Sequence, residues 1–110
     1  VEFRGFVPDL PRLLAASDLA LVQGGLSTCM ELAATRTPFI YFPLERHFEQ
    51  NVHVHHRLQR YGAGRALRYS DATPERIAAS IAEELAGVVR CCDVERDGAA
   101  VAARLISELL

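Results

Sequence analysis

The sequence predicts an α/β domain with a Rossmann-like parallel sheet of about four strands and flanking helices. Two short, continuous apolar runs, Leu19–Val22 and Phe39–Phe42, have the pattern of strands that are buried on both faces. Segments of helical periodicity follow each run, and the connections between them are only a few residues long. This alternation is typical of right-handed β–α–β units on a parallel sheet.

The remaining elements are predicted from weaker patterns. Val1–Val7 and Arg65–Tyr69 are the other two candidate strands. Helix-capping and helix-breaking residues mark the predicted helices. In chain order, the predicted helices are one that begins at Asp9 with Pro11 in its first turn, one over about Leu26 to Thr35, one from Phe48 to Tyr61 that Gly62 ends, one that starts at Thr73 and Pro74, and one over about Val94–Leu109 with Gly98 as a weak point.

Length and composition restrict the class of protein. The chain has 110 residues, of which 50% are hydrophobic and 24% charged, with a formal net charge of −2. This balance is too apolar for a disordered chain, and no apolar run approaches the roughly 20 residues of a spanning helix. The slightly acidic charge does not favour nucleic-acid binding. We expect one domain over residues 1–110, and four strands are few enough that part of this domain is expected to be absent.

Cysteine and histidine do not form a recognisable site. Cys29, Cys91 and Cys92 are odd in number and contain no CxxC motif, so we expect free thiols in a reducing cytoplasm. The four histidines, His47, His53, His55 and His56, lack a carboxylate or third ligand at a characteristic spacing. We therefore expect neither a bound metal nor a cofactor. We expect the histidines to pack against other residues or to face solvent.

The loop after the first buried strand is the first candidate site. In open parallel sheets, ligands bind beyond the carboxyl ends of the strands. Gly24 and Gly25 would allow the main chain to approach an anion, and the following helix N-terminus would favour phosphate. Ser27 and Thr28 would add hydroxyl donors. A plain structural turn is the alternative interpretation of these two glycines.

The helix after this loop has two different faces. At the α-helical pitch, Ser27, Thr28 and Glu31 share the side opposite the expected core. The carboxylate of Glu31 could accept hydrogen bonds from a ribose diol, or it could be a solvated surface group. The expected core side consists of Leu26, Cys29, Met30 and Ala33.

The loop after the second buried strand is the other candidate site. Gln50 and Asn51 lie in the first turn of the next predicted helix, at the edge of its core stripe of Val54, Leu58 and Tyr61. Their amides could donate to and accept from sugar hydroxyls. Glu49 could serve the same ligand, or it could compensate the charge of the helix N-terminus.

These segments together resemble the C-terminal, donor-binding domain of GT-B glycosyltransferases. The resemblance covers about Gly5 to Gly64 and is strongest to the MurG-like family 28 branch, which is related to the family 1 UDP-glycosyltransferases. Its markers, in order, are Gly5–Leu10, Ala16–Asp18, Gln23–Thr28 with Glu31, Pro38 and Pro43, His47–Asn51, and Tyr61–Gly64.

The resemblance implies a role for each candidate residue. The main chain at Val7 would contact the uracil edge of a UDP-sugar, and Glu31 would contact the ribose. Gly24, Gly25, Leu26, Ser27 and Thr28 would hold the diphosphate, and Glu49, Gln50 and Asn51 would contact the donor sugar. Gln23 departs from the histidine that many relatives have before the two glycines, where the histidine assists the diphosphate.

The resemblance also implies what lies outside this sequence. In GT-B enzymes, the acceptor site and the catalytic base come mainly from the N-terminal domain. We therefore expect no catalytic residue within 1–110, and a missing acceptor domain or partner subunit. A cytoplasmic location is expected, with peripheral association at the inner face of the membrane left open. Two alternatives also remain: a domain similar to UDP-GlcNAc 2-epimerases, and a non-catalytic donor-binding subunit.

Overall fold

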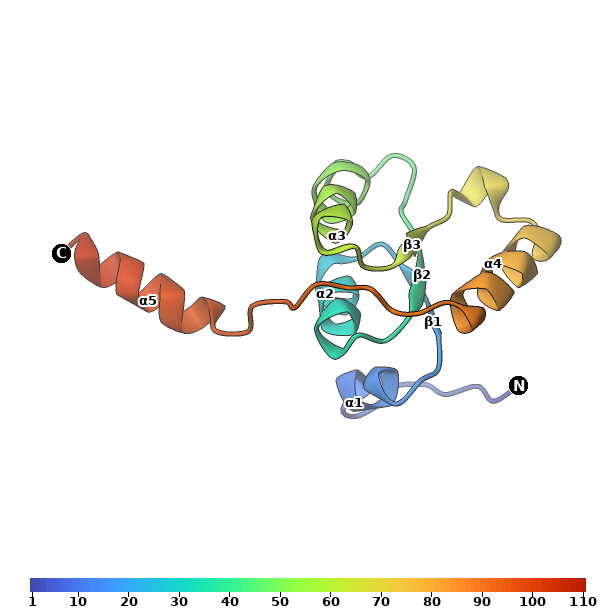
Figure 1. The fold of residues 1–110 in the computed structure, drawn as a ribbon, viewed down its shortest axis with the longest axis horizontal. Helices are drawn as coiled ribbons and strands as arrows, with labels where there is room; N and C mark the ends of the chain where they lie inside the picture. Colours follow the sequence, from blue (N-terminus) through green and yellow to red (C-terminus); the bar gives the residue numbers. More distant parts are fainter.

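The computed structural model describes every residue from Val1 to Leu110. Helices and strands alternate along the chain, as the apolar pattern predicts (Figure 1). In order, the elements are α1 (Leu10–Ala15), β1 (Ala20–Gln23), α2 (Leu26–Thr35), β2 (Phe39–Phe42), a π-helical segment (Glu49–Val54), α3 (His55–Tyr61), β3 (Arg65–Ala66), a short 3-10 helix (Tyr69–Asp71), α4 (Pro74–Ala86) and α5 (Gly98–Glu108).

The three strands form one parallel sheet in the order β1-β2-β3. Ala20 pairs with Phe39, and Ile40 pairs with Arg65, so β2 is the central strand. The predicted parallel α/β architecture is confirmed. The sheet has three strands where about four were expected.

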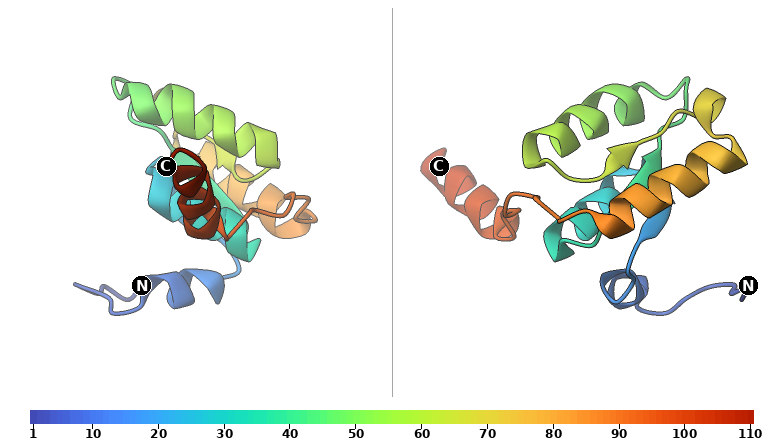
Figure 2. Two further views of the ribbon diagram at one scale, coloured as in Figure 1. Left: turned by 90° about the vertical axis from the view of Figure 1, so that its left-hand side faces the viewer. Right: turned by 45° about the vertical axis from the view of Figure 1, so that its right-hand side comes forward.

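Helices cover both faces of the sheet (Figures 1 and 2). Phe39 and Tyr41 of β2 belong to the core cluster that includes Leu32 of α2 and Leu58 of α3. Ile40 alternates with them and is also fully buried, although it lies outside that cluster. Because successive strand residues point to opposite faces, α2 and α3 cover one face and α4 covers the other. This double coverage explains the continuous apolar run of β2.

Most predicted helix ends are confirmed. The range predicted for α2 matches the observed one, and the predicted helix from Phe48 to Tyr61 consists of the π-helical segment followed by α3. Gly62 ends α3 with a φ of 63°, a left-handed conformation in which glycine avoids the penalty of a Cβ. Thr73 caps α4, since its side-chain oxygen accepts a hydrogen bond from Arg76 N at 3.2 Å.

Three predictions from the weaker patterns are wrong, whereas the predicted N-cap of α1 is confirmed: Asp9 holds that position, although its side chain makes no capping bond. Val1–Val7 forms no strand, because no neighbouring strand pairs with it, and Phe3 and Phe6 are each 93% exposed. The strand predicted at Arg65–Tyr69 is limited to the two residues of β3, the only ones that pair with β2. The last helix begins at Gly98 instead of Val94.

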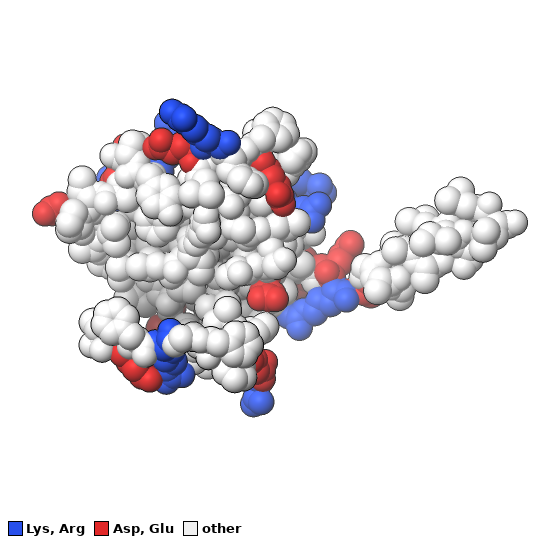
Figure 3. Space-filling view, turned by 180° about the vertical axis from the view of Figure 1, so that it is seen from behind, with Lys and Arg blue, Asp and Glu red and all other residues white.

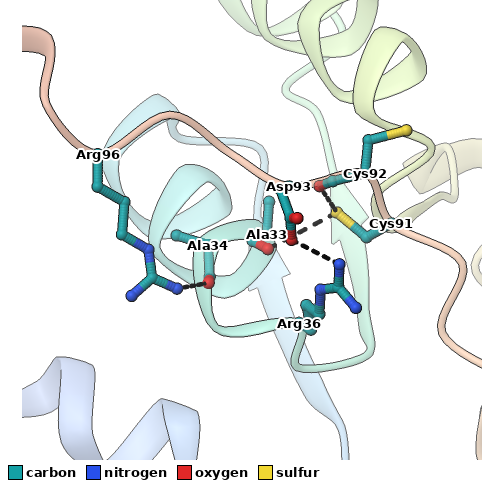
Figure 4. A network of polar contacts seen from close by, with 7 residues as sticks. All are labelled: Ala33, Ala34, Arg36, Cys91, Cys92, Asp93 and Arg96. Atoms are coloured by element: carbon teal, nitrogen blue, oxygen red, sulfur yellow. Dashed lines mark hydrogen bonds and ion pairs between the residues drawn. The ribbon is translucent and has the colours of Figure 1, made fainter.

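The chain before α5 is held by contacts with the rest of the domain, which explains the late start of that helix. Residues 88–97, the connecting strap, lie along the C-terminal end of α2 (Figure 4). Cys92 N donates to Tyr61 O at 2.8 Å, Asp93 pairs with Arg36 at 2.5 Å, and Arg96 donates to Ala34 O. These contacts hold the strap in an extended path. Beyond it, α5 projects away from the body of the domain (Figures 1 and 3).

Candidate functional site

The loops that follow β1 and β2 meet at the carboxyl edge of the sheet. We call Gly24–Thr28 the glycine loop and Pro43–Asn51 the amide loop. Gly24 N donates to Phe42 O at 3.2 Å, which extends the pairing of the two strands by one residue. Gly24 and Pro43 are both buried at this junction. The sheet thus brings together the two segments that the sequence singled out separately.

The contact between the two loops requires a glycine at position 24. A Cβ placed on Gly24 would lie 3.0 Å from Pro43 Cα and 3.4 Å from Gln50 Oε1. The first of these contacts is with main chain, which cannot move aside as a flexible side chain could. A Cβ on Gly25, by contrast, would meet nothing within 4 Å. The two adjacent glycines therefore have different roles: Gly24 allows close packing, and Gly25 leaves open space in front of α2.

The N-terminus of α2 faces this open space without an internal cap. Gly25 occupies the N-cap position and no side chain accepts a hydrogen bond from the first turn. The N–H groups of Leu26, Ser27 and Thr28 have no acceptor within the helix, and Cys29 N is the first to bond, to Gly25 O at 3.1 Å. The hydroxyls of Ser27 and Thr28 have no polar partner either. Such a cluster of donors, at the positive end of a helix, favours an anion.

The two faces of α2 are partly as predicted. Cys29 and Ala33 are buried, while Ser27 and Glu31 are exposed, and the Glu31 carboxylate forms no ion pair. Leu26, expected in the core, is 36% exposed. Burial raises the pKa of the Cys29 thiol to about 11, so this thiol remains protonated and belongs to the core.

The amide loop is held by Gln50 and Asn51. Gln50 Oε1 accepts a hydrogen bond from Leu44 N at 3.0 Å, and Asn51 Nδ2 donates to Leu44 O and to His47 O. Gln50 is only 9% exposed, so it lies within the core stripe and not at its edge as expected. Gln50 and Val54, which are four residues apart, lie on the same buried face of the π-helical segment.

Glu49 and Val7 lie in more open positions. Glu49 is exposed in the first turn of the π-helical segment and makes no side-chain hydrogen bond or ion pair. Val7 is half-buried in the irregular segment before α1, and its main-chain N–H and C=O make no hydrogen bond with other main-chain groups. The main chain at Val7 is therefore available to an external partner.

Tyr69 is a candidate that the sequence did not reveal. Its ring lies beside that of Phe42, with centroids 5.9 Å apart, and it follows the carboxyl end of β3. With Leu44, Glu45, Arg46 and His47 it lines an open hollow of about 480 Å³ next to the amide loop. The local sequence predicts Tyr69 only as the last residue of a strand, and it does not indicate that the ring lies beside the amide loop.

A more enclosed cavity of about 290 Å³ lies at the opposite, amino edge of the sheet. The start of β2, the end of α4 and residues 87–91 line it. Arg65, one of the charged groups there, pairs with Glu83 and with Glu84, and these pairs raise its pKa. Two of the arginines that line the cavity are thus already paired, Arg65 with these carboxylates and Arg36 with Asp93.

The structure has neither a cluster of metal ligands nor a helix suited to span a membrane. No group of three or more histidine, cysteine, aspartate or glutamate side chains is placed to hold a metal ion. None of the helices combines the length and the apolar character needed to cross a membrane.

Comparison with known families agrees with the architecture of this edge. Residues 1–96 match the family described as the glycosyltransferase family 28 C-terminal domain, and the chain belongs to that family. The match confirms the resemblance expected from the sequence. It includes both loops and ends before α5 begins at Gly98. No solved structure matches the chain.

Curated relatives include transferases from bacteria and an archaeon. The chain is 39% identical over 82 residues to a UDP-N-acetylglucosamine–N-acetylmuramyl-(pentapeptide) pyrophosphoryl-undecaprenol N-acetylglucosamine transferase of Methylobacterium radiotolerans, covering 74% of this chain and 22% of the relative. It is 40% identical over 83 residues to the transferase of the same name from Rhodopseudomonas palustris, with the same two coverages of 74% and 22%. An uncharacterized glycosyltransferase of Methanopyrus kandleri is 33% identical over 106 residues, covering 96% of this chain and 30% of the relative. The chain thus spans less than a third of each of these relatives.

Proposed function

We propose that this chain binds the nucleotide-sugar donor, a UDP-sugar, as the C-terminal part of a glycosyltransferase. The observation that carries the proposal is the uncapped N-terminus of α2 behind Gly24 and Gly25. It offers several unpartnered N–H groups to a diphosphate, next to open space that a Cβ at Gly25 would begin to fill. The membership of family 28 supports this use of the site.

The other candidate residues fit the remaining parts of such a donor. Glu31 lies one turn beyond the first turn of α2, and its exposed carboxylate would accept hydrogen bonds from the ribose hydroxyls. The unbonded main chain at Val7 would contact the edge of the base. Glu49 and the amide of Gln50, from the amide loop, would contact the sugar.

In the whole protein, we propose that the sugar passes from this donor to an acceptor hydroxyl. As the bond between the anomeric carbon and the diphosphate oxygen breaks, negative charge develops on the departing diphosphate. The helix N-terminus would stabilise that charge. We assign the catalytic base to the part of the longer protein that carries the acceptor site. The names of the two bacterial relatives make UDP-N-acetylglucosamine the first donor to test. Because such donors are intracellular metabolites, the proposal includes a cytoplasmic location.

The direct test is thermal unfolding of the chain with a panel of nucleotides. UDP, UDP-N-acetylglucosamine, GDP and ADP would each be added to the folded protein. A ligand present at 100 times its dissociation constant should stabilise the protein by about 2.7 kcal/mol, a shift of order 10 °C for a domain of this size. We expect uridine nucleotides to give the largest shift. No shift with any nucleotide, in a chain shown by circular dichroism to be folded, would refute the proposal.

The variant Glu31→Ala tests the assignment within the site. Loss of hydrogen bonds to a charged acceptor should weaken UDP binding about tenfold or more. Glu95→Ala is the matched control, because Glu95 is an exposed glutamate on the connecting strap with no ion pair. Isothermal titration calorimetry measures both variants. Equal UDP affinity in Glu31→Ala and the control would remove Glu31 from the site.

A further inference from the structure

Gln50 occupies an unusual position for a residue expected to contact a ligand. Only three buried residues are polar or charged, and Gln50 is one of them, with Thr37 and Ser80. Because Leu44 N can only donate, the atom facing it at 3.0 Å must be the amide oxygen, Oε1. One polar atom of Gln50 is thus committed to the main chain of the amide loop.

The same oxygen also lies against the glycine loop. A Cβ on Gly24 would approach Gln50 Oε1 to 3.4 Å and Pro43 Cα to 3.0 Å, so these atoms surround the space that glycine leaves empty. Gly24 N is bonded to Phe42 O at 3.2 Å immediately before Pro43. The glycine loop, the amide loop and the π-helical segment therefore meet around the side chain of Gln50.

The second polar atom of Gln50 remains available. Nε2 donates to no protein acceptor, yet no buried side-chain nitrogen or oxygen in the structure is without a partner. Nε2 must therefore reach the surface. Asn51 differs in this respect, because its Nδ2 already donates to two main-chain oxygens, those of Leu44 and His47.

We infer that Gln50 is a positioning residue that couples the glycine loop to the amide loop, in addition to its proposed contact with the donor sugar. This inference rests on the proposed function for its effect on ligands. Oε1 sets the distance between the loops, and Nε2 has no protein acceptor and remains accessible. A change at Gln50 is therefore transmitted to the glycine loop and, through it, to the diphosphate, which Gln50 itself does not contact.

The test compares Gln50→Leu with Gln59→Leu, the same substitution at an exposed glutamine of α3. Leucine at position 50 removes Oε1 and leaves Leu44 N without a partner. Isothermal titration calorimetry with UDP and with UDP-N-acetylglucosamine measures the effect. We expect Gln50→Leu to weaken UDP binding about threefold to tenfold, as for loss of one part-buried hydrogen bond, and to weaken UDP-N-acetylglucosamine binding more. Gln59→Leu should change neither. A loss for UDP-N-acetylglucosamine alone would overturn the coupling and leave only a direct sugar contact.

A measurement without ligand separates this inference from the proposed function. In Gln50→Leu, the amide resonances of Gly24 and Gly25 should shift in the NMR spectrum, and Leu44 N–H should exchange with solvent faster. Gln50→Glu retains an oxygen acceptor and should keep Leu44 N–H protected. If the wild-type chain binds no nucleotide, the proposed function fails, while these shifts still report the coupling. Unchanged glycine resonances in folded Gln50→Leu would overturn the inference even if UDP binds.

Discussion

Gly62 and Gly64 both have left-handed backbone conformations, yet we expect alanine at the two positions to have very different effects. Their φ angles are 63° and 67°, so a Cβ introduces nearly the same backbone strain at each. The surroundings differ. At Gly62 the nearest atom to an added Cβ is Arg90 O at 3.7 Å, an ordinary contact, whereas at Gly64 the Cβ would lie 2.4 Å from Phe39 Cε2 and 2.5 Å from Cζ.

The magnitude follows from these contacts. A left-handed alanine costs about 1–2 kcal/mol, partly offset because alanine restricts the unfolded chain more than glycine does. Gly62→Ala should therefore lower the free energy of unfolding by about 1 kcal/mol. Gly64→Ala adds overpacking against Phe39, which is 1% exposed in the core. Since overpacking costs about 1–3 kcal/mol, we expect a total loss of about 2–4 kcal/mol at Gly64.

Urea unfolding followed by circular dichroism measures both losses, with the slope of the transition checked for constancy. A double variant tests whether the steric collision with Phe39 causes the larger loss. Phe39→Leu removes the ring atoms that collide with the new Cβ, so the combination with Gly64→Ala should be less destabilised than the sum of the two single variants. Equal losses for Gly62→Ala and Gly64→Ala, or strict additivity in the double variant, would refute the steric argument.

Two further predictions concern buried titratable groups. In the folded protein, only one of the three thiols, that of Cys92, should react rapidly with a disulfide reagent at pH 8. The reason is that Cys29 and Cys91 are buried and that burial raises the pKa of both thiols. Rapid reaction of all three thiols before unfolding would contradict this prediction. Stability should also fall at alkaline pH, because burial raises the pKa of Cys29 from 9.0 to about 11 and that of Tyr41 from 10.0 to about 12. The unfolded chain loses these protons at a lower pH than the folded chain does. The free energy of unfolding therefore keeps its full value below pH 9. It falls as the pH rises from the unfolded pKa of each group through its folded pKa, at about 1.4 kcal/mol per pH unit for each group. Tyr41→Phe should flatten this decline above pH 10 in chemical unfolding measured at several pH values, and an unchanged slope would argue against the assignment.

The sequence was most informative where a pattern is local. The bounds of α2 and β2 were predicted correctly, because a helix follows from periodicity and capping and β2 from a continuous apolar run. The glycines and polar residues of both loops could also be singled out, since few residue types suit a loop that approaches an anion. The weak strand at Val1–Val7 failed for the complementary reason: a strand exists only where another strand pairs with it.

Contacts between distant residues were decided by the tertiary structure alone. The strap before α5 is extended because Arg36 and Tyr61 bind it, and Tyr69 joins the carboxyl edge because of the path the chain takes after β3. The same holds for Gln50. Its sequence position indicated a residue of the site, but only the fold shows that its oxygen accepts a hydrogen bond from Leu44 N and lies next to Gly24. Residue type and local spacing determine which groups are available, whereas close packing between separate loops depends on how the strands bring their ends together.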